Sequence, residues 1–312
     1  MSTIEDHVRP VGLPIGEGVA RQFDYWWTVY KRTWRGSVIS SFLSPIFYVI
    51  AMGVLLGGFI EGDPAQLEGA TSYLSFIVPG LVAAHAMQTA VGETTYPVMG
   101  LIKWQRVYDS MLATPLQVRH LVSAHLLFVA FRLATTSAVF MAMLAPFGVF
   151  ESWWGPLLAF GSQILVGMAF ASLVYGFTAR LRSEEGFGVL FRLGVFPLFL
   201  FSGAFFPVSN LGHVGEWAAR LTPLWHGVNL SRMFCIDHVD WSMAAVNVAV
   251  LLATPRPGLP PSVPRFYADI AAEWAKDIAG NIDKADSNWS RIRSISFPSA
   301  RSCRSARCSS AM

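Results

Sequence analysis

The sequence predicts an all-α integral membrane protein, and three observations support this fold class: the composition, the long apolar stretches and the distribution of basic residues. The chain has 312 residues, of which 53% are hydrophobic and only 14% charged, and its mean hydropathy is +0.45. A soluble protein carries far more charge, so lipid is the expected main solvent. The net charge of +3 is too small to indicate a nucleic-acid partner. The 3 cysteines are too few for a disulfide framework or a metal site.

Several stretches are apolar enough to cross a bilayer as helices, for which ~20 residues are needed. We expect the spans at Val38–Ile60, Tyr73–Val91, Leu121–Ala145, Leu157–Ala179 and Phe187–Phe206. A further stretch, Trp241–Ala253, is apolar but ends early, before the proline-rich run TPRPGLPPSVPR. We interpret it as a truncated sixth span.

Basic residues predict the orientation of the chain. Glu17–Arg35 mixes tryptophan and tyrosine with arginine and lysine, which is typical of a helix lying flat at the membrane surface. Lysine and arginine also follow the second and fourth spans, whereas the alternate loops are acidic or poor in basic residues. By the positive-inside rule, the N-terminus is cytoplasmic and the protein is a multi-pass component of the cell membrane.

No catalytic motif is present: the sequence lacks HExxH, GxSxG, a CxxC pair and a glycine-rich phosphate loop. We therefore predict no catalytic and no metal-binding residues, and any ATP-driven work would need another polypeptide. An integral membrane enzyme acting on lipid-linked sugars stays open as an alternative, although the external acids form no ordered motif. A non-transporting membrane scaffold is a second alternative, but it gives no reason for a charge at mid-depth in the third span.

The cytoplasmic segment Pro97–Gln117 is too charged to span and amphipathic enough to form a short helix. Trp104, Val107, Met111 and Leu112 fall near one face, and Pro115 ends the helix. Such a helix engages either lipid or a soluble partner, or it lies at the surface without one.

Two runs carry a resemblance to a known family. GETTYPVMGLIKWQRVYDSMLATPLQVRHL and FPLFLFSGAFFPVSNLGHVGEWAARLTPLWHGVNLSR resemble the membrane subunit of ABC-2 type exporters, in the branch of the nodulation lipo-oligosaccharide and daunorubicin-exporter permeases. The likeness covers about Gly16–Ala253. It implies six spans, an amphipathic connector helix, a coupling helix in the first cytoplasmic loop and an external hairpin that does not span. It also implies a homodimer in membrane lipid with separate ATPase subunits, which bind ATP and Mg, so that this chain needs no cofactor.

Carried onto this chain, the resemblance divides it into three parts. Residues 1–36 hold the cytoplasmic N-terminus and the connector helix, 37–253 the ABC-2 transmembrane domain with its hairpin at Pro207–Phe234, and 254–312 an atypical tail. The coupling region is Lys103–Pro115, and its most family-like positions are Arg106, Tyr108, Asp109, Met111, Leu112, Thr114 and Pro115. The serine- and arginine-rich tail is expected to be disordered, and a shifted reading frame near Thr254 is our hypothesis for its origin. The implied function is export of a lipid-linked glycan, a lipo-oligosaccharide or an amphipathic drug.

Polar residues inside the spans predict the transport path. Arg132 lies near mid-depth, where a charge costs ~2.5–3.5 kcal/mol, so it lines the path and meets an anionic group or else holds helices together. His125 lies two turns earlier on the same helix. Glu93 closes the second span and is either solvated or paired with Arg180 or Arg182. Phe199 and Phe205 belong to a phenylalanine cluster that forms an aromatic wall for the cargo or packs against lipid and helices.

Overall fold

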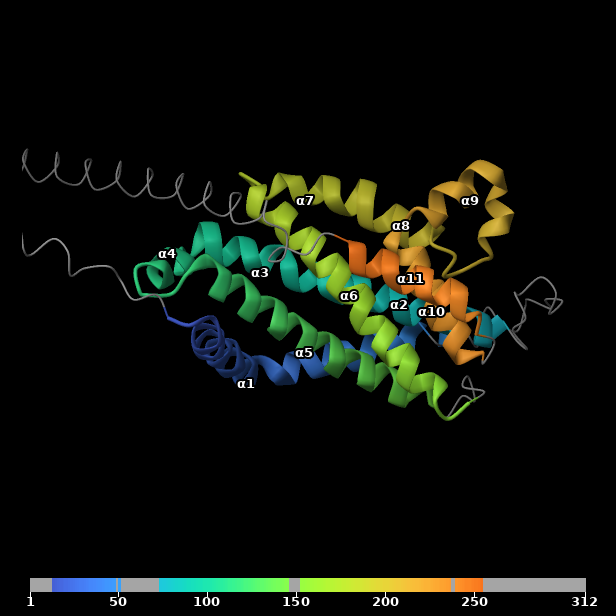
Figure 1. Ribbon diagram of the computed structural model, residues 1–312, viewed down its shortest axis with the longest axis horizontal. Helices are drawn as coiled ribbons and strands as arrows, with labels where there is room; N and C mark the ends of the chain where they lie inside the picture. The colour runs from blue at the N-terminus through green and yellow to red at the C-terminus, as the bar shows by residue number, and fades with distance from the viewer. Residues whose placement is uncertain (1–12, 49, 52–72, 146–151, 237–238, 255–312) are drawn as a thin grey trace, which may run out of the picture. The chain divides into compact units, whose positions relative to one another are not determined.

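A computed structural model of the chain describes residues 13–48, 50–51, 73–145, 152–236 and 239–254. In that part of the chain every regular element is a helix, which confirms the predicted all-α class (Figure 1). All of these helices belong to one compact unit, Met1–Leu259. The predicted disordered tail from residue 255 onwards, and residues 49 and 52–60 of the first predicted span, lie outside the described residues.

The first half of the chain contains α1 (Ile15–Tyr48), α2 (Tyr73–Thr94), α3 (Tyr96–Met99), the π-helix η4 (Gly100–Trp104), α4 (Val107–Leu112) and α5 (Val118–Leu144). The second half contains α6 (Gly155–Arg180), α7 (Glu185–Val189), the π-helix η6 (Leu190–Val195), α8 (Phe196–Phe201), the 3-10 helix η7 (Val208–Leu211), α9 (Gly212–Arg220), α10 (Pro223–Cys235) and α11 (Trp241–Ala253). The connector region and the start of the first predicted span thus form one helix, α1.

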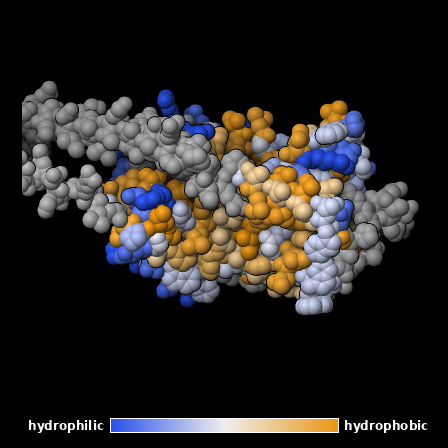
Figure 2. All heavy atoms as spheres, viewed as in Figure 1, coloured by the Kyte–Doolittle hydropathy of each residue, from blue (hydrophilic) through white to orange (hydrophobic). Residues whose placement is uncertain are grey.

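Among the described residues, 3 helices are long and apolar enough to cross a membrane: Ser75–Trp104, Val118–Leu144 and Gly155–Arg180. They correspond to the second, third and fourth predicted spans. The fifth prediction falls on the shorter α7, η6 and α8, and the sixth on α11, whose bounds are those expected from the sequence. On the face shown in Figure 2, apolar residues cover the middle of the bundle and hydrophilic residues gather towards its ends, as expected for a protein surrounded by lipid.

The second predicted span was placed too short. Its helix continues beyond Val91 through α3 and η4 as one column, Ser75–Trp104, which we call the α2–η4 column. Backbone hydrogen bonds from Thr95 to Val91 and from Met99 to Thr95 carry the helix across the change from α2 to α3. Pro97 lies in the first turn of α3, a position where proline is common because its fixed φ suits a helix. The polar residues around Glu93 predicted the end of the second span at this point, but the helix continues to Trp104.

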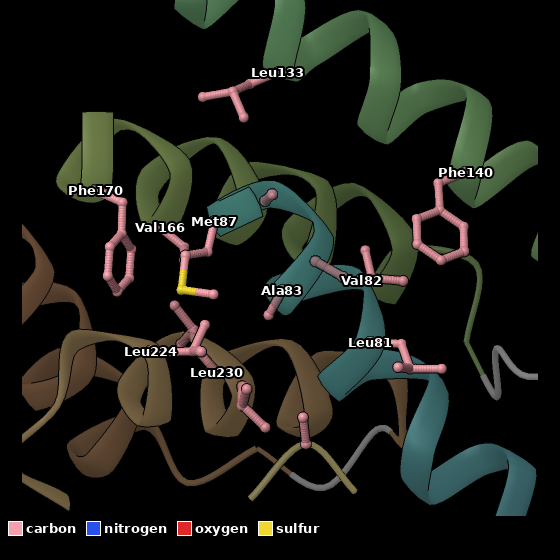
Figure 3. Close-up of a cluster of buried hydrophobic side chains, with 14 of the residues drawn as sticks. Leu81, Val82, Ala83, Met87, Leu133, Phe140, Val166, Phe170, Leu224 and Leu230 are labelled. Atoms are coloured by element: carbon pink, nitrogen blue, oxygen red, sulfur yellow. The ribbon is translucent and has the colours of Figure 1, made fainter. Parts of the chain in front are cut away.

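The core lies where α2, α6 and α10 meet, with α5 and α11 packed beside them. In Figure 3 the side chains of Met87 on α2, Val166 and Phe170 on α6, and Leu224 on α10 converge. The Val166 side chain of α6 packs directly on the α10 backbone, because a Cβ on Gly227 of α10 would lie 2.1 Å from Val166 Cγ2. Only glycine fits at such a crossing, as in other helix contacts within membranes.

The predicted hairpin Pro207–Phe234 is formed by η7, α9 and α10. A new helix starts at Pro223, after Thr222, whose hydroxyl oxygen accepts a hydrogen bond from the Trp225 N–H. Residues of α10 are mostly buried, and Arg232 on it is only 7% exposed. The Arg232 guanidinium donates to the Gly203 carbonyl oxygen at 2.8 Å and lies 3.9 Å from the centre of the Phe76 ring. The depth of the hairpin in the bilayer stays a prediction.

Helix α11 has a defined start. The Asp240 carboxylate accepts hydrogen bonds from the Ser242 hydroxyl and from the backbone N–H groups of Ser242 and Met243, which caps the first turn. These hydrogen bonds, that of the Ser242 side chain foremost, lower the pKa of Asp240. Further along α11, Asn247 Oδ1 lies 2.7 Å from His226 Nδ1 and links α11 to α10.

Candidate coupling and transport site

The α2–η4 column is followed by a sharp corner at Arg106. This residue has φ 50° and ψ 32°, a left-handed conformation that is uncommon for a residue other than glycine. Its Nε donates to Asp109 Oδ2 at 2.6 Å. The short helix predicted within Pro97–Gln117 is therefore divided: residues up to Trp104 continue the column, and only the 6 residues of α4 form the separate helix. Trp104, expected on the apolar face, is 57% exposed.

Tyr108 fastens α4 to the bundle. Its side chain is only 4% exposed, and its hydroxyl lies 3.5 Å from His125 Nδ1 on α5 and 3.4 Å from the Tyr175 hydroxyl on α6. Trp26 of α1 stacks on His125, with the two ring centres 4.3 Å apart. A single residue of α4 thus meets a cluster built from α1, α5 and α6. We call Trp26, Tyr108, His125 and Tyr175 the aromatic anchor.

Helix α1 adds further contacts. The Gln22 side-chain amide lies 3.3 Å from Met111 Sδ on α4, and Gly18 approaches α5 so closely that a Cβ would lie 2.7 Å from the His120 ring. Trp26 is 6% exposed and also stacks on Phe128, with ring centres 5.2 Å apart. The aromatic residues of Glu17–Arg35 were expected on a helix lying flat at the membrane surface, but the ring of Trp26 is buried against α5.

The remaining predicted coupling positions lie on the outer side of α4 and in the turn after it. Arg106, Thr114 and Pro115 are exposed, and Leu112 is half-buried. The Thr114 hydroxyl donates to the Met111 carbonyl oxygen at 2.6 Å and closes the end of α4. These side chains are accessible to a partner on this side, but their role in coupling stays a prediction.

Arg132 forms an ion pair with Glu93. Its Nε donates to Glu93 Oε1 at 2.9 Å, and its guanidinium lies 5.5 Å from the centre of the Tyr30 ring. The side chains are 11% and 23% exposed, respectively. The sequence had suggested Arg180, Arg182 or water for Glu93, because Glu93 was placed at the end of its span. Within the longer column it instead faces the middle of α5, while His125 belongs to the aromatic anchor.

The phenylalanines of the predicted path lie elsewhere. Phe199 and Phe205 pack edge to face, with ring centres 4.9 Å apart, and both are half-buried against the core. The Tyr73 hydroxyl donates to the Phe205 carbonyl oxygen at 3.3 Å. Tyr73 and Glu93 lie near opposite ends of α2, about 30 Å apart at 1.5 Å per residue. Arg132 and the two phenylalanines therefore do not form one cluster.

An apolar cavity of about 390 Å³ lies between α8 and α9, near these phenylalanines in the sequence. Its lining is Leu193, Pro197, Leu198, Phe201, Ser202, Leu211, Gly215, Ala218, Ala219 and Thr222. Neither Phe199 nor Phe205 lines it. Within the described residues, no three or more His, Cys, Asp and Glu side chains come together as metal ligands would. Binding of ATP and Mg by a separate subunit stays a prediction.

The model of the ABC-2 type transporter family matches residues 23–234, which include the aromatic anchor, the Arg132–Glu93 pair and the whole predicted hairpin. This chain belongs to the ABC-2 type transporter family. Nodulation protein J of Rhizobium leguminosarum bv. trifolii is 32% identical over 220 residues, which cover 68% of this chain and 82% of that protein. Nodulation protein J of Sinorhizobium fredii is 30% identical over 229 residues, with coverages of 70% and 84%.

A third relative of this ABC-2 transporter is the inner membrane transport permease YadH of Escherichia coli, which is 25% identical over 236 residues, 72% of this chain and 82% of that protein. No solved structure matches the chain. The resemblance seen in the sequence is thus confirmed at the level of the family.

Sequence reasoning about this ABC-2 transporter missed the aromatic anchor except for Tyr108. One signal was available: His125 and Tyr175 lie inside apolar spans, where a polar side chain needs a protein partner. That rule predicts that such residues have partners without saying which ones. Trp26 gave no comparable signal, because tryptophan next to basic residues is typical of the membrane interface as well.

Proposed function

We propose that this chain is the membrane permease subunit of an ATP-driven exporter, which moves a lipid-linked glycan, a lipo-oligosaccharide or another amphipathic molecule out of the cytoplasm. Membership of the ABC-2 family supports this proposal, as does the likeness to proteins named for nodulation and for inner membrane transport. In the proposed orientation the N-terminus and α4 lie on the cytoplasmic side, next to separate ATPase subunits that bind ATP and Mg.

The burial of Tyr108 is the observation that carries the proposal. A six-residue helix has little stability of its own, yet α4 is held by a side chain that contacts α5 and α6 and adjoins α1. A force applied to the exposed side of α4 is therefore passed to three helices at once. The ATPase subunits supply the force, α4 receives it through Arg106, Thr114 and Pro115, and the spans respond.

A second copy of the chain completes the exporter in this proposal. One bundle has too few membrane-long helices to enclose a route by itself, since only 3 are found among the described residues. Helices α7, η6 and α8 carry exposed apolar side chains at helical spacing, namely Val189, Leu193, Phe196 and Leu200. We assign this face to the second copy because its side chains are apolar and exposed.

Cross-linking tests whether α4 and the turn after it lie next to the ATPase subunits. Thr114→Cys places a thiol in the exposed turn after α4, and Trp217→Cys places a matched thiol on exposed α9. Both variants carry serine at Cys303 and Cys308, while Cys235 is buried and stays. After treatment of intact native membranes with a maleimide–benzophenone reagent, the partner is identified by mass spectrometry.

We expect Thr114→Cys to cross-link to a nucleotide-binding ATPase and Trp217→Cys not to do so. Cross-linking of the ATPase through position 217 alone would contradict the proposed orientation. A cross-link to no ATPase from either position would favour a scaffold without transport.

A further inference from the structure

Helix α2 changes character halfway along its length. From Ser75 to Ala84 it is buried on all sides. From His85 onwards the side chains on one side are half-buried and polar: His85, Gln88, Thr89 and Glu93. The spacing of these four residues is that of a single helix face.

The polar face of α2 lies along α5. Near one end, His85 packs edge to face against Phe140 of α5, with ring centres 5.2 Å apart. At the other end, Glu93 pairs with Arg132. Thr135, one turn from Arg132, is half-buried, and its hydroxyl donates to the Arg132 carbonyl oxygen at 2.9 Å. We call His85, Gln88, Thr89, Glu93, Arg132 and Thr135 the polar seam.

The seam lies within two helices that are long enough to span the membrane. Lipid chains offer no hydrogen bonds, so exposed polar groups at this depth face water, protein or a polar ligand. The chain itself leaves these side chains only half-buried. A ligand with hydrogen-bonding groups would satisfy Gln88 and Thr89 where lipid does not.

The charge of the seam limits what it binds. Arg132 is neutralised by Glu93 at 2.9 Å and covered on one side by Tyr30. The anion expected for an isolated arginine at this position would have to compete with a carboxylate already in place. The seam therefore offers paired charges, an amide and hydroxyls without a net charge, which suits a ligand group that has none either.

We propose that the polar seam is the site that receives the polar head of the cargo, and that this head is uncharged and rich in hydroxyl or amide groups. This inference rests on the proposed export function and specifies its substrate class and its site. It also assigns Arg132 a role different from the capture of an anionic group, because Arg132 and Glu93 act together as neutral donor and acceptor.

The test uses the complex of this chain with its co-purifying ATPase in lipid nanodiscs. Two probes share one alkyl chain and differ in the head: dodecyl maltoside, which is uncharged and polyhydroxylated, and dodecyl phosphate, which is anionic. Both are added below their micellar concentrations, and stimulation of ATP hydrolysis is measured. We expect dodecyl maltoside to stimulate hydrolysis and dodecyl phosphate to be much weaker.

Variants locate the site. Gln88→Leu with Thr89→Val, and separately Thr135→Val, are expected to raise the concentration of dodecyl maltoside for half-maximal stimulation, by about tenfold for the double variant. Thr136→Val is the matched control, because Thr136 also donates to the Arg132 carbonyl oxygen but is buried away from the seam. It should respond as the unmodified chain does.

A charge change gives an independent readout. Glu93→Gln leaves Arg132 without its carboxylate and should make dodecyl phosphate the better probe, and adding Arg132→Gln should abolish that gain. Preference of the unmodified chain for dodecyl phosphate, response to neither probe, or seam variants that respond like Thr136→Val would each overturn the inference. In all three cases an ATPase bound to the chain would leave the export proposal standing, whereas lack of any bound ATPase would refute that proposal first.

Discussion

Two regions of this transporter are held together in different ways. In the core, glycines let one backbone approach another: a Cβ on Gly80 of α2 would lie 2.6 Å from Ala204 Cα, and a Cβ on Gly155 of α6 would lie 2.2 Å from the Phe234 carbonyl oxygen of α10. Around α4, the contacts are made by large aromatic and polar side chains, such as Trp26 on His125. Backbones in direct contact have no room to shift, whereas stacked rings slide and repack at small cost. We infer that the core is the fixed part of the bundle and that α1, α4 and the start of α5 are the part that moves.

The largest effect is expected in the core. Gly227→Ala places a methyl group 2.1 Å from Val166 Cγ2, which forces helices apart and should destabilise the bundle by about 3 kcal/mol. Gly161→Ala on α6 is the control, since nothing lies within 4 Å of its Cβ position. Thermal unfolding in detergent and the amount of protein in the membrane measure the effect. Equal stability of the two variants would show that the core is not rigid.

The next effect concerns the buried cation of the hairpin. Arg232→Met removes the hydrogen bond to Gly203 and the contact with Phe76, with an expected loss of about 2 kcal/mol. Arg220→Met breaks the exposed pair with Glu216 and a cation–π contact of 5.6 Å with the Trp225 ring, and should cost about 1 kcal/mol or less. The same unfolding measurement compares them. If both cost the same, burial of Arg232 does not contribute to stability.

Two substitutions of Tyr108 separate the contribution of its ring packing from that of its hydroxyl group in the contact between α4 and the bundle. Its hydroxyl contacts of 3.4 and 3.5 Å are long for hydrogen bonds, so Tyr108→Phe should retain most of the export rate. Tyr108→Ala removes the ring that joins α4 to the bundle and should lower export per ATP hydrolysed by about tenfold or more. Export and hydrolysis are measured together in proteoliposomes. Equal loss in both variants would assign the coupling to the hydroxyl.

The smallest effect is expected at the corner before α4. Arg106→Gly relieves the left-handed backbone of a residue with a side chain, worth roughly 1 kcal/mol, and removes an exposed ion pair of similar size. The two changes nearly cancel, so thermal stability should stay almost the same. A large loss of stability would mean that the Arg106 side chain, rather than Tyr108, fixes the direction of α4.

The positions of the apolar helices could be predicted from the sequence better than the contacts between them. Apolar length identified α6 and α11 closely, because this signal is local. The Arg132–Glu93 pair joins residues 39 positions apart, and nothing local shows which faces of two helices meet. The end of the second span was misplaced for a related reason: a polar run predicts solvent, but here it faces another helix.

The continuity of the α2–η4 column has a thermodynamic consequence. Glu93 lies within this column, and the corner that leads to α4 lies directly beyond its last residue, Trp104. If docking of an ATPase on α4 changes the affinity of the polar seam for cargo by some factor, cargo must change the affinity of the chain for the ATPase by the same factor. Titration with cargo in the presence and absence of the ATPase, and titration with the ATPase in the presence and absence of cargo, should then give the same coupling free energy.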